Sequence, residues 1–375
     1  MRIAIDARGI NWYRGTGIGT YTQNLLSNML KLSYDNYFHI YWSGDSYDPF
    51  FSENSKIIMT SKRHHRFFQQ SYIPNNLLKE NIDLYHVPQN GIGLSDSINC
   101  KKVITVHDLI PYIMPETVGK GYLMQFLKEV PQVIQNCDAI ITVSEWSKKD
   151  ILKFFPINPD KIFVTPLATD MKYKSMDKNW CKYILETKFN ITTPYILYVG
   201  GFSPRKNVKS LIMAFSKIYN NLDKEHSLVI IGSLRDEGIV LKELTESLGI
   251  SSKVIFTEFV EEDYLPVLYN AAEVFVYPSL YEGFGLPLLE AMSCGAPVIT
   301  SDISSIPEVV NDAGILINPY DNSNLIDALG NVLSNETLRN EMSEKGLKRA
   351  SQYSWKLTAD KTLESYSKIL QGDIN

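Results

Sequence analysis

Residues 274–302 read VFVYPSLYEGFGLPLLEAMSCGAPVITSD, and this stretch predicts one strand–helix–strand unit. Its two ends, VFVYPS (274–279) and PVITSD (297–302), are short and almost continuously apolar. Runs of this kind form strands that are buried on both faces of a parallel sheet. Between them a glycine-rich loop leads into a helix that begins near Pro287. Strands that alternate with helices in this way indicate α/β architecture.

Similar apolar runs recur along the 375 residues in two sets. The first set is RIAIDA (2–7), FHIYWS (38–43), KIIMTS (56–61), DLYHVP (83–88), KVITVHD (102–108), AIITVS (139–144) and KIFVTP (161–166). The second set consists of the two runs above together with YILYVGG (195–201), LVIIGS (228–233), VIFTEFV (254–260) and GILINP (314–319). A polar, irregular segment separates the sets. We therefore expect two Rossmann-like domains, residues 1–168 and 169–352, and an amphipathic helical segment, 353–375, that packs back on the first domain.

The overall composition is that of an ordinary globular protein, with 44% hydrophobic and 21% charged residues. A formal net charge of −5 gives no reason to expect a nucleic-acid partner. The four cysteines are scattered and never form C-x-x-C, which favours reduced thiols over a disulfide framework or a zinc site. The start, MRIAIDARGINW, becomes charged too early for a signal peptide, and no apolar run reaches the roughly 18–20 residues of a membrane span. We expect a soluble, cytoplasmic protein.

Two carboxylates belong to the glycine-rich loop and the helix that follows it. Glu282 lies in the loop, and Glu290 lies about one turn into the helix. Glycines let backbone N–H groups approach a ligand, and the helix start favours an anion. A carboxylate can accept two hydroxyl groups, as a sugar diol requires. The layout therefore suits a phosphate-bearing sugar ligand, although a structural turn with a Glu that complements the helix dipole has the same pattern.

A second anion-suited loop follows the first strand of the second domain. There YILYVGG leads into Pro204-Arg205-Lys206-Asn207 and then a helix, so two cations stand at a strand–helix turn. An isolated Arg-Lys pair is more often a solvated turn. Two such loops at strand ends of one sheet instead favour a pyrophosphate site, because ligands of doubly wound sheets bind at the carboxyl ends of the strands.

The first domain offers two further candidate loops. Gly15, Gly17 and Gly19 precede a helix, but their spacing matches neither a Walker loop nor the dinucleotide fingerprint. His107 and Asp108 end the run VITVHD, where side chains can reach a ligand, although a lone histidine is more often structural.

Together these motifs resemble the retaining nucleotide-sugar glycosyltransferases of family 4, which have the GT-B fold. The hallmark is the E-x7-E element from Glu282 to Glu290, and GTGIGTYTQNLL, VHDLIPY, TVSEWSKKDI and YVGGFSPRKNVKSLI are similar to the branch with bacterial mannosyl- and rhamnosyltransferases of surface-polysaccharide assembly. The resemblance covers essentially the whole chain. It implies two Rossmann-like domains that face each other across a cleft.

The resemblance also implies roles for individual residues. Arg205 and Lys206 would stabilise the leaving nucleoside diphosphate. Glu290 would bind the ribose and Glu282 the transferred sugar. His107 would sit at the donor sugar and Gly17 in a loop over the phosphates. The remaining donor contacts would come largely from backbone groups, at Phe259, Val260, Gly283, Phe284, Gly285 and Leu286.

The expected reaction is transfer of a hexose or deoxyhexose, with GDP-mannose as the favoured donor, to a glycan or lipid-linked glycan with retention of configuration. No Asp-x-Asp triplet occurs, so we expect metal-independent catalysis without a cofactor. A catalytically inactive sugar-nucleotide-binding subunit, or another GT-B enzyme such as a sugar-nucleotide epimerase, is the alternative.

One basic segment remains. In SKRHHRFFQQSYIP (61–74), Lys62, Arg63 and Arg66 alternate with histidines and aromatic residues. One interpretation is a polar loop that enters a helix whose Phe67, Phe68 and Tyr72 are core. The other is peripheral contact of residues 62–68 with an anionic membrane at its inner face, where each cation contributes about 1 kcal/mol.

Overall fold

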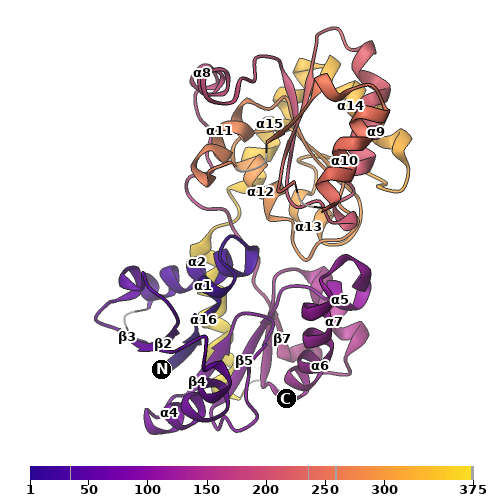
Figure 1. Cartoon of the computed structure of the whole chain (residues 1–375). Coiled ribbons are helices and arrows are strands. Elements are labelled where there is room, and N and C mark those ends of the chain that lie inside the picture. The colour runs from indigo at the N-terminus through magenta and orange to yellow at the C-terminus, as the bar shows by residue number, and fades with distance from the viewer. Residues whose placement is uncertain (34, 235, 258–259, 373–375) are drawn as a thin grey trace. The chain divides into compact units, whose positions relative to one another are not determined.

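The computed structural model describes residues 1–33, 35–234, 236–257 and 260–372. It divides into two compact units (Figure 1). Unit 1 is Met1–Ala168 with the C-terminal segment that starts at Ser354, and unit 2 is Thr169–Tyr353. Each unit is built around one sheet in which all paired strands are parallel. The α/β prediction is therefore confirmed for both sets of strands.

The sheet of unit 1 has the order β3-β2-β1-β4-β5-β6-β7. Its strands are β1 (Arg2–Asp6), β2 (Tyr37–Trp42), β3 (Ser55–Met59), β4 (Leu84–Val87), β5 (Lys101–Val106), β6 (Ala139–Thr142) and β7 (Ile162–Val164). The helices of unit 1 are α1 (Gly9–Trp12), α2 (Gly17–Leu32), α3 (His65–Phe67), α4 (Ile73–Lys79), α5 (Ile110–Ile113), α6 (Lys120–Asn136), α7 (Glu145–Phe154) and α16 (Trp355–Gln371). A π-helical turn, η2 (Phe68–Tyr72), joins α3 to α4.

The sheet of unit 2 has the order β10-β9-β8-β11-β12-β13. Its strands are β8 (Tyr195–Val199), β9 (Ser227–Ile231), β10 (Val254–Thr257), β11 (Val274–Tyr277), β12 (Val298–Ser301) and β13 (Ile315–Ile317). Its helices are α8 (Lys178–Phe189), α9 (Val208–Ile218), α10 (Asp236–Ser247), α11 (Leu265–Ala271), α12 (Leu286–Ser293), α13 (Ile306–Val310), α14 (Asn322–Ser334) and α15 (Glu336–Ala350). Because β8 and β11 are neighbours, the loops that follow them leave the same edge of the sheet.

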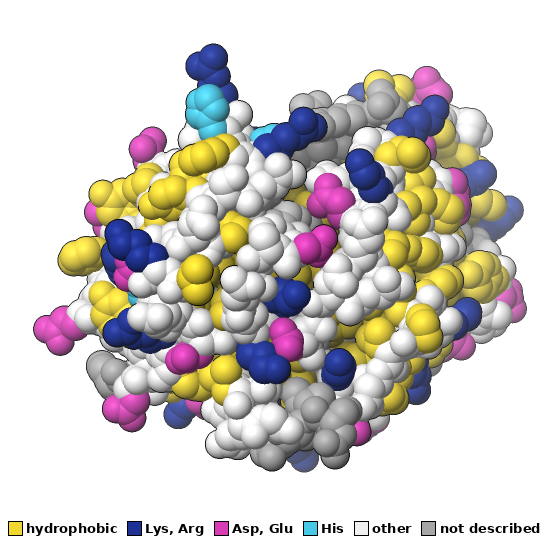
Figure 2. All heavy atoms as spheres, turned by 90° about the horizontal axis from the view of Figure 1, so that it is seen from below, with side chains coloured by type: hydrophobic (Ala, Val, Ile, Leu, Met, Phe, Trp, Pro, Cys, Tyr) yellow, Lys and Arg dark blue, Asp and Glu magenta, His cyan; other side chains and the backbone are white. Residues whose placement is uncertain are grey.

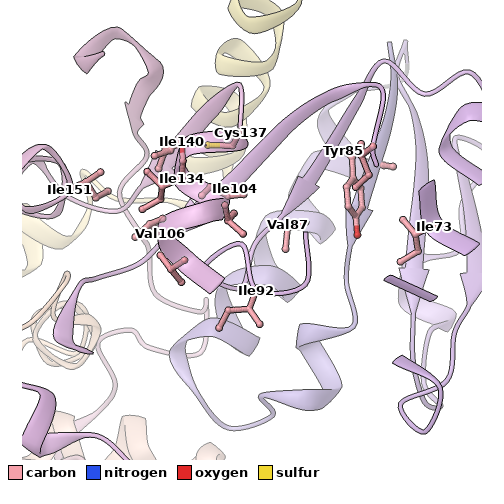
Figure 3. Packing of buried hydrophobic residues seen from close by; sticks show 14 of the residues in the cluster. Ile73, Tyr85, Val87, Ile92, Ile104, Val106, Ile134, Cys137, Ile140 and Ile151 are labelled. Atoms are coloured by element: carbon pink, nitrogen blue, oxygen red, sulfur yellow. Dashed lines mark hydrogen bonds between the residues drawn. The ribbon is translucent and has the colours of Figure 1, made fainter. Parts of the chain in front are cut away.

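The apolar runs in the middle of each sheet form strands that are buried along nearly their whole length, whereas the edge strands β3 and β13 keep exposed residues. In unit 1, side chains of α4, α6 and α7 pack with the sheet in one buried cluster. Figure 3 shows Ile104, Ile134 and Ile140 lying close together in this cluster. Burial of such side chains stabilises the fold by about 1.5–3 kcal/mol each.

Helix α16 belongs to unit 1 although it follows unit 2 in the chain (Figure 1, yellow). It packs against α2. Its Tyr366 hydroxyl lies 2.6 Å from Nδ1 of the buried His86, and its Thr358 hydroxyl donates to the Pro166 carbonyl at 2.6 Å. These contacts tie the helix to the first sheet.

Candidate functional site

Two loops of unit 2 are held together where β8 and β11 end. The Leu280 amide donates to the Arg205 carbonyl at 2.7 Å, and the Ser279 hydroxyl oxygen lies 3.2 Å from the same carbonyl. The loop with the cations and the loop with Glu282 therefore form one surface, as expected for turns at the carboxyl edge of a parallel sheet.

The Glu282 carboxylate lies at the centre of this surface. Its Oε1 is 2.8 Å from Arg205 Nη1 and 2.7 Å from Lys206 Nζ. It also accepts hydrogen bonds from the hydroxyls of Ser279 (2.5 Å) and Tyr277 (3.1 Å). In addition, Lys206 donates to the Tyr277 hydroxyl and Arg205 to the Tyr281 carbonyl. We call Arg205, Lys206 and Glu282 the cation cluster.

The charges of the cation cluster decide the protonation state of Glu282. Burial by itself raises the pKa of this carboxyl, because only 8% of the residue is exposed. The neighbouring Lys206 and Arg205 outweigh burial and hold the pKa at about 2. Glu282 is therefore ionised at neutral pH, and the cluster keeps one positive charge in excess.

The glycine-rich loop is shaped by backbone requirements. Gly285 is in the left-handed region (φ +103°) and immediately precedes α12, so a side chain there would be strained. The Glu282 amide donates to the Ser304 hydroxyl and its carbonyl accepts from Ser305, which fixes the loop on the following turn. The predicted helix start near Pro287 is confirmed, and the backbone from Gly283 to Leu286 lies at its positive end.

Glu290 occupies a different place from the cation cluster. It lies on α12, is partly buried, and its Oε2 accepts from the Tyr269 hydroxyl at 3.1 Å. Burial raises its pKa to about 7, although hydrogen bonds from Tyr269 and Tyr173 work in the opposite direction. Neither tyrosine was predicted from the sequence, since Tyr173 lies in the irregular segment before α8 and Tyr269 lies on α11.

Val260 and Phe259 are the two remaining candidate residues of the second domain. Val260 is buried. Phe259 lies outside the described residues.

His107 and Gly17 belong to unit 1. His107 directly follows β5; its Nε2 is 3.0 Å from the Pro88 carbonyl, and its ring packs edge-on against Tyr21 at 4.8 Å. A carbonyl can only accept, so Nε2 carries the proton. Burial lowers the pKa of His107 to about 4, and the ring is neutral at pH 7.

Gly17 is the first residue of α2 and is exposed. A Cβ added at Gly17 would meet nothing within 4 Å, whereas one at Gly19 would lie 2.5 Å from the Tyr13 carbonyl oxygen. Close packing therefore explains why position 19 must be a glycine, but it does not explain the glycine at position 17.

The basic segment is not an ordinary entry to a core helix. Phe67 is 57% exposed and Tyr72 is 37% exposed, so the interpretation of these two as core is wrong. Phe68 is partly buried against the unit 1 core. Lys62, Arg63 and Arg66 are all exposed.

In the described part of the chain, no three His, Cys, Asp or Glu side chains gather as a metal site would require. No helix in those ranges has the length and apolar character needed to cross a membrane. On the face seen in Figure 2, cationic and anionic side chains are interspersed.

Comparison with known proteins agrees with this geometry. A family model described as Glycosyltransferase Family 4 matches residues 15–173, and one described as Glycosyl transferases group 1 matches residues 184–349. O-antigen chain mannosyltransferase B of Escherichia coli is 34% identical over 266 residues, which are 71% of this chain and 70% of that protein. Serotype-specific mannosyltransferase WbdA of Escherichia coli is 31% identical over 281 residues, 74% of this chain and 34% of that protein.

A solved structure shares the fold. The Anabaena protein HepE, in complex with UDP and glucose, superimposes with a TM-score of 0.76 at 15% sequence identity, over 98% of this chain and 99% of that chain. The GT-B fold class predicted from the sequence is confirmed.

Proposed function

Because the chain belongs to the family 4 (group 1) glycosyltransferases, we propose that it moves a hexose or deoxyhexose from a nucleoside-diphosphate sugar to a glycan or lipid-linked glycan. GDP-mannose is the favoured donor, since two similar proteins are mannosyltransferases. The proposed reaction retains the anomeric configuration and needs neither a metal nor a cofactor.

The observation that carries the proposal is the cation cluster. Breaking the glycosidic bond to a nucleoside diphosphate places negative charge on the departing phosphate. Arg205 and Lys206 are fixed beside each other by their bonds to Glu282, so they need no rearrangement to meet that charge. Each preorganised donor of this kind lowers the barrier by roughly 3–4 kcal/mol. In this role they would replace a divalent cation.

The other donor contacts follow from charge and position. Ionised Glu282, whose Oε1 holds the cations, would accept a hydroxyl of the transferred sugar through Oε2. The backbone from Gly283 to Leu286 would contact the sugar and diphosphate at the start of α12. Glu290 would accept the ribose hydroxyls. The base would meet backbone near Val260 and Phe259.

Two residues of unit 1 would complete the donor site. Gly17, which packing does not require, would let the start of α2 approach the phosphates. Neutral His107 would hydrogen-bond to the donor sugar and would add no charge.

A donor panel tests the proposed function. Purified full-length protein is incubated with GDP-mannose, UDP-glucose or dTDP-rhamnose, with and without a glycan acceptor and with excess EDTA. We expect acceptor-dependent nucleotide release from one donor, a product of unchanged anomeric configuration by NMR, and undiminished turnover in EDTA. Nucleotide binding without any turnover would instead identify an inactive binding subunit, and conversion of the free donor would identify an epimerase. Loss of turnover in EDTA that Mg²⁺ restores would refute metal independence.

A further inference from the structure

Helix α2 carries a second residue that bears on the donor site. The helix begins at Gly17, and Tyr21, about one turn further along, is completely buried. The Tyr21 ring meets the His107 ring at 89°, with the ring centres 4.8 Å apart. We propose that Tyr21 positions the His107 ring for the donor sugar, and that helix α16 holds Tyr21 in place through a chain of buried hydrogen bonds. This inference rests on the role proposed for His107.

The Tyr21 contact settles what the other bonds of His107 leave open. The His107 amide donates to Asn90 Oδ1 at 2.9 Å, and its Nε2 donates to the Pro88 carbonyl at 3.0 Å. These bonds fix the backbone and one ring nitrogen, but rotation of a histidine ring plane is only broadly restricted by its own torsion. Edge-on packing against Tyr21 selects one orientation of the plane. It thereby directs Nδ1, the nitrogen that can accept a hydrogen bond from a sugar hydroxyl.

A chain of buried polar groups holds Tyr21. Its hydroxyl lies 3.1 Å from Thr105 Oγ1, and that oxygen lies 2.7 Å from His86 Nε2. The chain ends on α16, where the Tyr366 hydroxyl lies 2.6 Å from His86 Nδ1. All four side chains are 0% exposed. Because a lost partner would leave a buried polar atom unsatisfied, the chain favours the one arrangement in which every member is bonded.

His86 connects the two ends of this chain. Burial lowers its pKa to about 3, so its ring is neutral at pH 7. A neutral imidazole has one donor and one acceptor, and hydroxyl groups, which can act as either, lie at both nitrogens. The His86 ring also packs edge-on against the Tyr366 ring, with the centres 5.7 Å apart. The orientation of His86 is therefore set from α16.

Helix α16 also contacts Tyr21 through an apolar surface. It packs against α2 (Figure 1), and its first residue, Trp355, has its ring centre 6.2 Å from that of Tyr21. One polar and one apolar contact thus link α16 to the residue that packs on His107. Apolar packing alone would hold a helix without the cost of burying polar groups. The polar chain adds a fixed orientation, which is what a positioning role requires.

Histidine NMR and nucleotide release from GDP-mannose, both with the full chain, test the proposal. Tyr21→Leu removes the ring, Tyr21→Phe keeps the ring and removes the hydroxyl, and Tyr366→Phe cuts the chain at α16. Tyr41→Phe is the matched control. Tyr41 is a fully buried tyrosine of the same unit, and its hydroxyl donates to Asn76 Oδ1 at 2.9 Å, outside the chain.

Removal of the Tyr21 ring should affect His107 and the sugar but not the nucleotide. In Tyr21→Leu we expect the His107 pKa to rise from about 4 toward the ordinary 6.5, because the ring is less enclosed. The kcat should fall about tenfold through misplacement of the ring. GDP affinity should be unchanged, because GDP has no sugar for His107 to meet. Tyr21→Phe, which keeps the packing contact, should retain most of the turnover.

The cut at α16 separates positioning from stability. Tyr366→Phe should shift the His107 ring signals and lower kcat about threefold. Its melting temperature should fall about as much as that of Tyr41→Phe, which should turn over like the wild type. If Tyr21→Leu does not fold, Tyr366→Phe decides by the same two measurements.

Equal His107 titration in Tyr21→Leu and the wild type, or equal turnover in the two, would overturn the proposal. The same loss of turnover in Tyr41→Phe as in Tyr366→Phe would also overturn it, because the effect would then be one of stability. The NMR measurement needs no donor. A shifted His107 titration in Tyr21→Leu, with no nucleotide release by the wild type, would count against the proposed function and leave the positioning contact supported.

Discussion

Glu282→Gln removes one negative charge from the point where Arg205 and Lys206 meet. A pKa of about 2 in place of 4.5 corresponds to about 3 kcal/mol in favour of the ionised carboxylate. Because the folded pKa is depressed, this stability is present above pH 4.5 and is lost as the pH falls toward 2. At pH 7 the variant should therefore lose about 3 kcal/mol, which for a unit of this size lowers the melting temperature by roughly 6–12 °C.

A nucleoside diphosphate should reverse much of that loss. It supplies negative charge to the same two cations, and a ligand at 100 times its Kd stabilises the folded state by about 2.7 kcal/mol. We expect the variant to bind GDP at least as tightly as the wild type, while transfer falls tenfold or more because a neutral amide holds the sugar hydroxyl more weakly than a carboxylate does.

The assay combines differential scanning fluorimetry, with and without GDP, and a nucleotide-release assay. Glu225→Gln is the control: its carboxylate is 62% exposed and pairs with Lys253 at the surface, so its removal should leave the melting temperature nearly unchanged. The reasoning is refuted if Glu282→Gln melts and turns over like the wild type, or if GDP fails to restore the lost stability.

Four further predictions concern the same molecule. Arg205→Ala and Lys206→Ala should each lower kcat about 100-fold with the fold retained; normal turnover in both would contradict the phosphate assignment. Burial raises the Glu290 pKa to about 7, so its ionisation should destabilise the ligand-free fold as the pH rises through 7. The same ionisation should strengthen GDP binding. In calorimetry from pH 6 to 8, Glu290→Gln should abolish the part of the pH dependence that is due to this carboxylate. Gly17→Ala should slow transfer at an unchanged melting temperature, whereas Gly19→Ala should lower the melting temperature through its clash with the Tyr13 carbonyl; the reverse pattern would exclude Gly17 from the donor site. Lys62, Arg63 and Arg66 changed together to Ser should reduce sedimentation with anionic liposomes and transfer to a lipid-linked acceptor but leave donor hydrolysis intact; unchanged sedimentation and transfer would remove the membrane contact.

The strands could be predicted because they are short and apolar, and those in the middle of each sheet are buried along nearly their whole length. The same local logic located the start of α12 at Pro287 and the glycines before it. What a local pattern cannot supply is which strands are neighbours. Arg205 and Glu282 are 77 residues apart in sequence, and they touch because β8 pairs with β11. The sequence assigned the two residues separate roles, to phosphate and to sugar, and did not predict that they bond to each other.

The features of unit 1 were harder to predict for a physical reason. Phe67 and Tyr72 look like core residues because aromatic side chains usually are, but Phe67, the last residue of α3, and Tyr72, the last residue of the π-helical turn, are both exposed. Tyr21 carried no signal of its own, since its hydroxyl meets Thr105, which is 84 residues later. In unit 2, Tyr277 and Ser279 lie at the polar end of an apolar run, and the sequence did not predict that their hydroxyls bond to Glu282.

The way α16 completes unit 1 bears on the order in which the chain is synthesised. Residues 1–168 leave the ribosome first, yet the hydroxyls that meet His86 and the Pro166 carbonyl are on residues 366 and 358. Domains generally fold in the order of their synthesis. Here the nascent first unit must wait, with the surface beneath α16 uncovered, until the whole of unit 2 has been translated. A chain cut after residue 353 would thus impair the unit made first and spare the one made last.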